Sequence, residues 1–148
     1  MTYLENNGFK FLNFINIPET DLKKYQDLSG SFAVVKCEGK FLLCYNTWRK
    51  QWELPSRGRE NNETSKECAI RELYEETGQL VTNLEFKGLI KAENSLDGNI
   101  KYNPVYFTTM EKLQPFIENE ETSEIKFWDL NEKIGYIDSV DINIFDYL

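Results

Sequence analysis

One helix of this chain has both of its ends encoded in the sequence. Residues 64–67, Thr-Ser-Lys-Glu, form a capping box, in which the Thr64 hydroxyl accepts a backbone N–H bond and Glu67 reaches back to the cap. Gly78 follows the last residue of the helical period and suits the left-handed conformation that closes a helix. The sequence therefore predicts a helix between Thr64 and Gly78.

Three glutamates crowd one edge of this predicted helix. Glu72, Glu75 and Glu76 are spaced i, i+3 and i+4, which places them within an arc of about 100°. Like charges at this spacing repel by roughly 0.2–0.5 kcal/mol per pair. Hard divalent cations bind carboxylate oxygens, so the trio is a candidate ligand set for Mg²⁺. The alternative is a solvated acidic helix face.

Residues 71–80, Arg-Glu-Leu-Tyr-Glu-Glu-Thr-Gly-Gln-Leu, resemble the second half of the Nudix box. Glu63 stands eight positions before Arg71, where that pattern also has a Glu, and Trp52-Glu-Leu-Pro55 is similar to the family's lead-in. The chain departs from the pattern at Arg57, which occupies the position of the opening Gly, while Gly58 comes one place late.

The resemblance to the MutT-like Nudix hydrolases implies an α/β fold, an α/β/α sandwich with a central mixed β-sheet. It implies a Mg²⁺ or Mn²⁺ cofactor held by Glu72, Glu75 and Glu76, with Arg71 orienting these side chains by pairing with Glu63. Gly58 and Gly78 are expected to be structural. A general base is expected on the helix, at Glu75 or Glu76, or in a later acidic loop. Glu121 is the leading loop candidate, and its rivals are Glu118, Glu120 and Glu124.

The loop from Asn46 to Arg59 holds the densest basic cluster and leads directly into the acidic helix. Arginines beside a metal-binding carboxylate set suit a polyphosphate, so Arg49, Arg57 and Arg59 are predicted to bind substrate. The alternative is surface charge that balances the acidic neighbour.

Composition limits the other classes of function. The chain has 148 residues, 41% of them hydrophobic, which suits a single domain over 1–148 with residues 1–30 as an N-terminal strand and helix extension. It has no histidine, so acid–base chemistry must use carboxylates, Lys, Tyr or metal-bound water. A net charge of −8 argues against binding duplex DNA. Three cysteines without metal-type spacing indicate reduced thiols in a cytoplasmic protein, and no apolar run approaches the ~20 residues of a membrane span.

Other elements are expected around the central helix. Residues 32–37 and 40–45 predict a hairpin around Glu38-Gly39. Further expected elements are a strand at 9–15, a short helix at 18–28, strands at 81–92 with a bend at Gly88, at 101–109 and at 125–128, and a helix after Asp138.

The expected reaction is hydrolysis of a nucleoside diphosphate linked to another group. A (deoxy)nucleoside triphosphate, giving the monophosphate and pyrophosphate, is the leading substrate class. ADP-ribose or another nucleotide sugar, and the 5′ end of RNA, stay open. A nucleotide-binding module with weak turnover is the competing hypothesis, and a homodimer is compatible with either.

Overall fold

The computed structural model describes residues 5–6, 8–26, 28–56 and 58–148. Arg57, a predicted substrate-binding residue, lies outside the described residues. The elements in chain order are β1 (Glu5–Asn6), β2 (Phe9–Ile15), the 3₁₀ helix η1 (Glu19–Lys24), β3 (Phe32–Cys37), β4 (Lys40–Asn46), β5 (Gln51–Glu53), α1 (Ser65–Thr77), β6 (Glu85–Asn94), β7 (Ile100–Met110), β8 (Thr122–Trp128) and the 3₁₀ helix η2 (Asp141–Tyr147).

The strands form one mixed sheet in the order β1-β2-β6-β7-β3-β4-β5, with β8 also paired to β4. The β3–β7 pair is parallel and the other strand pairs are antiparallel. Strand β4 contacts β3 near its start and β5 near its end, and β8 follows its other edge. This branch brings the β4–β5 connection and the start of β8 together at one end of the sheet.

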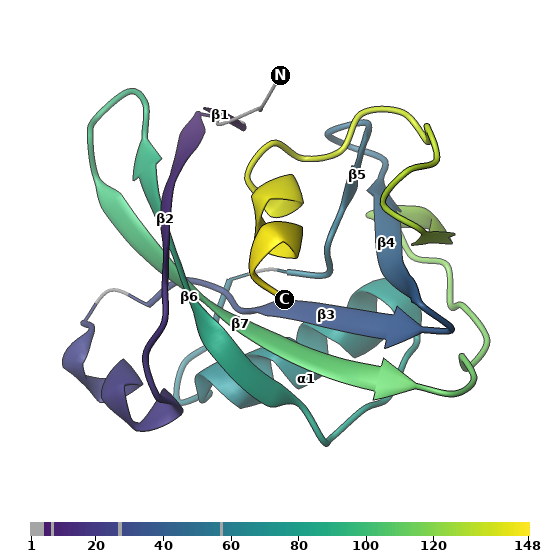
Figure 1. Cartoon of the computed structure of the whole chain (residues 1–148), viewed down its shortest axis with the longest axis horizontal. Helices are drawn as coiled ribbons and strands as arrows, with labels where there is room; N and C mark the ends of the chain where they lie inside the picture. Colours follow the sequence, from purple (N-terminus) through teal and green to yellow (C-terminus); the bar gives the residue numbers. More distant parts are fainter. Residues whose placement is uncertain (1–4, 7, 27, 57) are drawn as a thin grey trace.

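Both faces of the sheet are covered, which confirms the predicted α/β sandwich. In β3, Phe32 and Val34 point into one core and Ala33 and Val35 into the other, as the alternation of a strand requires. Helix α1 covers the second core through Ala69 and Leu73. The segment around η2 covers the first core, and Figure 1 shows it on the opposite side of the sheet from α1.

Several expected elements are present at nearly the predicted positions. The 32–37/40–45 hairpin and the strand at 9–15 are confirmed, and the β6–β7 register shifts between Phe86 and Gly88, where a bend was expected. All three cysteines are free thiols and buried.

Four expectations need correction. The loop from Asn46 to Arg59 contains strand β5, because Trp52 and its neighbours pair with the end of β4. Strand β8 begins at Thr122 rather than 125, and η1 ends at Lys24. The C-terminal helix is a 3₁₀ helix: Asp138 binds the N–H groups of Val140 and Asp141, and a seven-residue terminal segment is too short to sustain an α-helix by itself.

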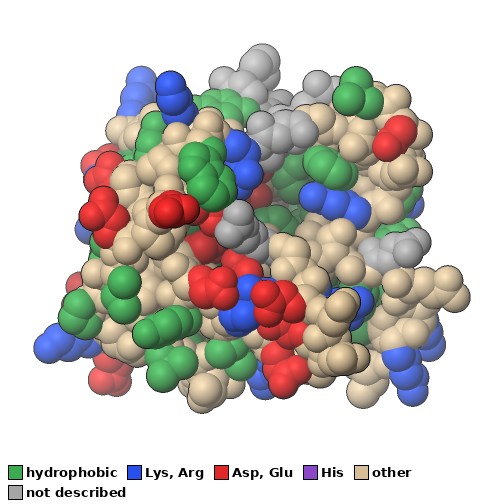
Figure 2. All heavy atoms as spheres, turned by 180° about the vertical axis from the view of Figure 1, so that it is seen from behind, with side chains coloured by type: hydrophobic (Ala, Val, Ile, Leu, Met, Phe, Trp, Pro, Cys, Tyr) green, Lys and Arg blue, Asp and Glu red, His purple; other side chains and the backbone are tan. Residues whose placement is uncertain are grey.

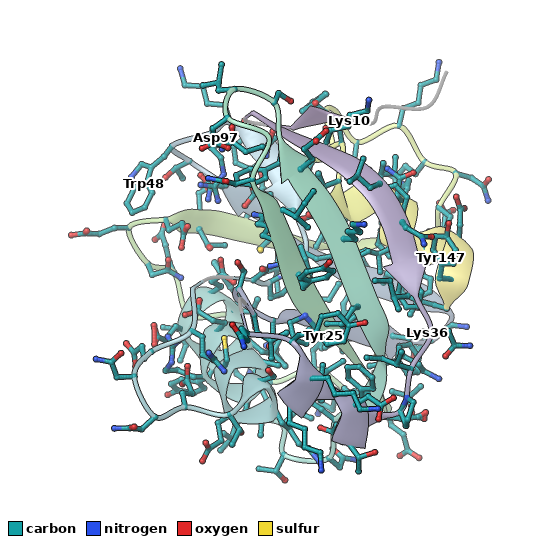
Figure 3. All side chains as sticks on the ribbon, turned by 90° about the vertical axis from the view of Figure 1, so that its left-hand side faces the viewer. Lys10, Tyr25, Lys36, Trp48, Asp97 and Tyr147 are labelled. Carbon is teal, nitrogen blue, oxygen red and sulfur yellow. The ribbon has the colours of Figure 1, made fainter. Side chains whose placement is uncertain are left out.

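The N-terminal extension is built into the sheet through β2, which pairs with β6 over most of its length. The ring of Phe14 stacks on Tyr147, with centroids 4.7 Å apart. Figure 3 shows Tyr147 of η2 beside β2. The N-terminal strand and the C-terminal helix therefore meet on one face of the sheet. Among the described residues, no helix is long and apolar enough to cross a membrane.

Candidate active site

Helix α1 carries the predicted glutamates between two well-formed ends. The Thr64 hydroxyl accepts from Glu67 N at 3.1 Å, and the Glu67 carboxylate accepts from Thr64 N at 2.9 Å. Gly78 ends the helix with φ of 82°. The capping box and the glycine closure are thus both present as expected.

The three glutamates of α1 differ in how deeply they are buried. Glu72 and Glu76 are 1% and 3% exposed on the side of α1 that faces the sheet, whereas Glu75 is exposed. Glu76 Oε2 accepts from the backbone N–H of Ser56 at 2.8 Å, which ties the helix to the segment after β5. Burial raises the pKa of Glu76 well above its ordinary value, and the nearby carboxylates of Glu121 and Glu72 raise it further.

Arg71 contacts several acidic side chains on and beside α1. Its guanidinium donates to Glu63 at 2.6 and 3.0 Å, which is the pair the sequence indicated, and it also contacts Glu72 and Glu75. Its Nη2 donates to the Gly58 carbonyl at 3.1 Å. The hydrogen bond from Arg71 lowers the pKa of Glu63. Figure 2, seen from the side of α1, shows acidic side chains gathered around a basic one on this face.

Glu121 lies at the start of β8, and Asn119 holds it against α1. Asn119 Nδ2 donates to the carbonyls of Glu75 and Glu76 at 3.0 and 3.2 Å, while its Oδ1 accepts from Glu121 N at 3.1 Å. Glu121 is 5% exposed and accepts from Asn46 Nδ2 at 3.1 Å. The loop therefore delivers one buried carboxylate to the site, whereas the rivals Glu118, Glu120 and Glu124 are exposed.

Of the arginines that were predicted to bind substrate, Arg49 lies at this site. Arg49 Nε and Nη2 donate to the two carboxylate oxygens of Glu53 at 2.6 and 2.8 Å, and Nη2 lies 3.7 Å from Glu121. Glu53 also accepts from Gln51 Nε2 at 2.6 Å, so its carboxylate is a firm anchor for Arg49. Arg59 is exposed and lines two neighbouring cavities rather than the one beside Arg49.

A cavity of about 380 Å³ adjoins the acidic site on the side of β5. Its polar lining includes Arg49, Glu53, Lys101, Asn103, Asp138 and Asp141. Burial raises the pKa of Asp141 well above its ordinary value, and Asp138 beside it adds to the effect.

Among these polar lining residues, Arg49 was the one predicted to bind substrate. Glu53 lies within Trp52–Pro55, the segment that is similar to the family's lead-in. The sequence pattern therefore does mark its position. Lys101, Asn103 and the two aspartates come from β7 and the C-terminal segment, and no local pattern marks them.

The donor set suits a hard divalent cation, because several carboxylates converge where the low dielectric makes their charge costly. In the described part of the chain, no three acidic or cysteine side chains already stand close enough to enclose an ion. Arg71 engages Glu72 and Glu75, and Ser56 engages Glu76. Cation binding would therefore exchange these contacts for metal–oxygen bonds.

Comparison with solved structures first defines the class of fold. The chain is similar to a MutT NUDIX hydrolase from Burkholderia pseudomallei, with TM-score 0.71 and 16% identity over 84% of this chain and 99% of that one. It is similar to a mutant form of the Bacillus subtilis pyrophosphohydrolase BsRppH, with TM-score 0.70 and 19% identity over 99% and 92%. The NUDIX domain of Shewanella oneidensis NrtR, solved with ADP ribose, gives TM-score 0.67 and 19% identity over 88% and 96%. These likenesses show a MutT-type α/β fold.

The family model for the NUDIX domain matches residues 28–146, which is most of the chain. No curated protein sequence is significantly similar to it. The chain belongs to the Nudix family, and it is a pyrophosphohydrolase of nucleoside diphosphate derivatives.

Proposed function

We propose that this protein hydrolyses (deoxy)nucleoside triphosphates to the monophosphate and pyrophosphate, with Mg²⁺ or Mn²⁺ as cofactor. The observation that supports it is the pair of buried carboxylates on α1, Glu72 and Glu76, which lies near the buried Glu121. The Glu121 carboxylate is in turn 3.7 Å from Arg49. Carboxylates bind the cation and an arginine binds phosphate oxygens, so the set matches a metal-bound polyphosphate.

Glu72 and Glu76 are the proposed direct ligands, because one turn of helix separates them and both face inward. Glu75 is exposed, and it would serve a second ion or act through water. The bound cation would withdraw charge from a phosphoryl oxygen and lower the pKa of a bound water. Arg71 positions Glu72 and Glu75 through its ion pairs.

Glu121 is the proposed general base. It would take a proton from the attacking water as a new P–O bond forms and the bond to the bridging anhydride oxygen breaks, releasing pyrophosphate. Asn119 fixes its backbone and Asn46 fixes its carboxylate, so the base is held in one place. Arg49, anchored by Glu53, would stabilise the negative charge that the reaction develops. Arg57 and Arg59 remain proposed contacts to the outer phosphates.

The remaining proposals concern the setting of the enzyme. Its buried free thiols fit a cytoplasmic location. The net charge of −8 fits a small nucleotide held through a cation better than it fits a DNA duplex. A homodimer is a compatible assembly.

Release of pyrophosphate and phosphate from a panel of nucleotides with Mg²⁺, Mn²⁺ or EDTA tests the proposal. Metal-dependent release is expected, and Glu76→Gln should lower turnover by ~10² or more, equivalent to about 2.7 kcal/mol of barrier. Glu124→Gln changes an exposed glutamate outside the site and is the matched control. Binding of nucleotides without metal-dependent release, or near-normal turnover in Glu76→Gln, would favour the nucleotide-binding module instead.

A further inference from the structure

One buried amide bridges Glu53, which binds Arg49, to Asp138 in the C-terminal segment. Gln51, on β5, donates from Nε2 to Glu53 Oε2 at 2.6 Å and to Asp138 Oδ2 at 2.9 Å. All three of these side chains are buried. Burial raises the pKa of Asp138, and the charge of nearby Glu53 raises it further. The amide therefore places a shared donor between two carboxylates that repel each other.

Asp138 is fixed to the rest of the fold at three other points. Its Oδ1 accepts from the N–H groups of Val140 at 2.9 Å and Asp141 at 3.0 Å, while Oδ2 accepts from Gln51. Its backbone N–H donates to the carbonyl of Trp52, the residue after Gln51 on β5, at 2.8 Å. The start of η2 is thus a fixed support for the Gln51 amide.

Glu53 connects this support to Arg49, because both of its carboxylate oxygens are engaged. Its Oε1 accepts from Arg49 Nη2 at 2.8 Å and its Oε2 accepts from Arg49 Nε at 2.6 Å, so one edge of the guanidinium is held in the plane of the carboxylate. The Arg49 side chain is 38% exposed. In the part of the chain that the structure describes, its Nη1 donates to no acceptor, so the outer end of the guanidinium can meet a phosphate oxygen.

We infer that Gln51 and Asp138 are positioning residues, which hold Arg49 in place for the phosphates by fixing Glu53. The inference rests on the proposed function and deepens it, because Arg49 is the proposed phosphate contact. Without the amide, Glu53 Oε2 would keep only its bond from Arg49, and the two carboxylates would repel with no donor between them. Glu53 and its arginine would then shift, and a misplaced binding group lowers the rate of a reaction.

The first measurement is the hydrogen exchange of the Arg49 Nε–H proton in the full chain, followed by NMR without substrate. Gln51→Leu removes the shared donor. Asp138→Asn places an NH₂ group opposite the NH₂ group of Gln51, while its remaining oxygen can still accept from Val140 and Asp141. Exchange should become about tenfold faster in each variant, as the loss of one hydrogen bond to a charged group provides.

Arg71 is the control within the same spectra. Its Nε donates to Glu63 at 2.6 Å, which is also the length of the bond from Arg49 Nε to Glu53. The exchange of the Arg71 proton should not change in either variant. Asp146→Asn removes an exposed carboxylate from the same C-terminal segment, and it should change the exchange of neither arginine.

The second measurement is metal-dependent nucleotide turnover. Gln51→Leu should lower kcat/KM about tenfold. Adding Gln51→Leu to Arg49→Met should lower kcat/KM no further, because Gln51 acts through the arginine and the two effects are then not additive. A loss of packing alone would add to the effect of Arg49→Met.

Four results would overturn the inference: unchanged Arg49 exchange in both variants, a matching rise for Arg71, normal turnover of Gln51→Leu, or an additive loss in the double variant. Each of them leaves the proposed function intact. If no nucleotide is hydrolysed, the proposed function fails, and the exchange of the Arg49 proton alone decides whether the bridge holds the arginine.

Discussion

A carboxyl group inside a protein is costly to ionise unless a cation compensates it, and this site gathers several. Glu72, Glu76 and Glu121 are buried within one cluster, and the pKa of Glu76 is raised by burial and by its acidic neighbours. If only the stability of the fold mattered, a neutral side chain would be favoured in place of such a buried carboxyl group. In a site that binds a divalent cation, the bound cation offsets the mutual repulsion of the carboxylates, so their repulsion favours cation binding.

Asp141 makes a separate prediction at the residue scale, away from the proposed ligands. Its pKa is raised above the ordinary 3.8 by burial, so folding favours the protonated form. The stability this gives is complete below the unfolded pKa and is lost as pH rises through the folded pKa. Asp141→Asn keeps an oxygen for Leu54 N but cannot ionise. The melting temperature of the variant minus that of the wild type should therefore increase as pH is raised from about 4 to about 8.

Asp146→Asn is the control for that experiment, because Asp146 is exposed on the same 3₁₀ helix. Its melting temperature should run parallel to the wild type across the range. A parallel curve for Asp141→Asn as well would show that the aspartate does not titrate as its burial indicates.

At the scale of elements, the end of α1 and the start of β8 act as one unit. Thr77 O accepts from Ile117 N at 3.4 Å, and Asn119 bonds both the last turn of α1 and the backbone of Glu121. The helix that carries the proposed ligands thus also positions the proposed base. A shift at the helix end should disturb both.

Gly78 tests this coupling, since it combines φ of +82° with close neighbours. A Cβ there would lie 2.8 Å from Ile117 Cγ1 and 2.9 Å from the Pro115 carbonyl oxygen. Gly98 has φ of +76° and nothing within 4 Å, so Gly98→Ala isolates the backbone strain. In urea denaturation Gly98→Ala should cost about 1 kcal/mol, and Gly78→Ala at least about twice as much. Equal costs would mean that the 115–117 segment moves freely, and the proposed positioning of Glu121 would fail.

At the scale of the whole molecule, the sheet separates two cores, and the site lies at the end where β4, β5, β8 and α1 meet. A ligand that binds only the folded chain stabilises it in proportion to the logarithm of its concentration. Mn²⁺ at about 100 times its dissociation constant should therefore add about 2.7 kcal/mol to the free energy of unfolding. The gain should vanish in Glu72→Gln. Equal stabilisation of wild type and variant would place the ion elsewhere.

Sequence patterns were sufficient for the parts of this molecule that are local in the chain. The capping box, Gly78 and the 32–45 hairpin each involve neighbours, so their residues predict their structure directly. Burial of Glu72 and Glu76 but not Glu75 depends on how α1 docks on the sheet, which helical spacing alone does not specify. The pairing of Arg49 with Glu53 needed strand β5, which the loop interpretation missed. Lys101 and Asn103 share one face of β7 by strand alternation, but Asp141 comes from η2 and joins them only through tertiary packing, so no local pattern could place the three together.

Diffraction from crystals soaked in Mn²⁺ shows whether α1 holds the cation, because the anomalous signal of the ion locates it without assumption. If Glu72 and Glu76 hold the ion, a peak lies within direct bonding distance of their carboxylate oxygens, and Arg71 is displaced from Glu72. An empty helix edge, with Arg71 still bound to Glu72 at saturating Mn²⁺, would contradict it.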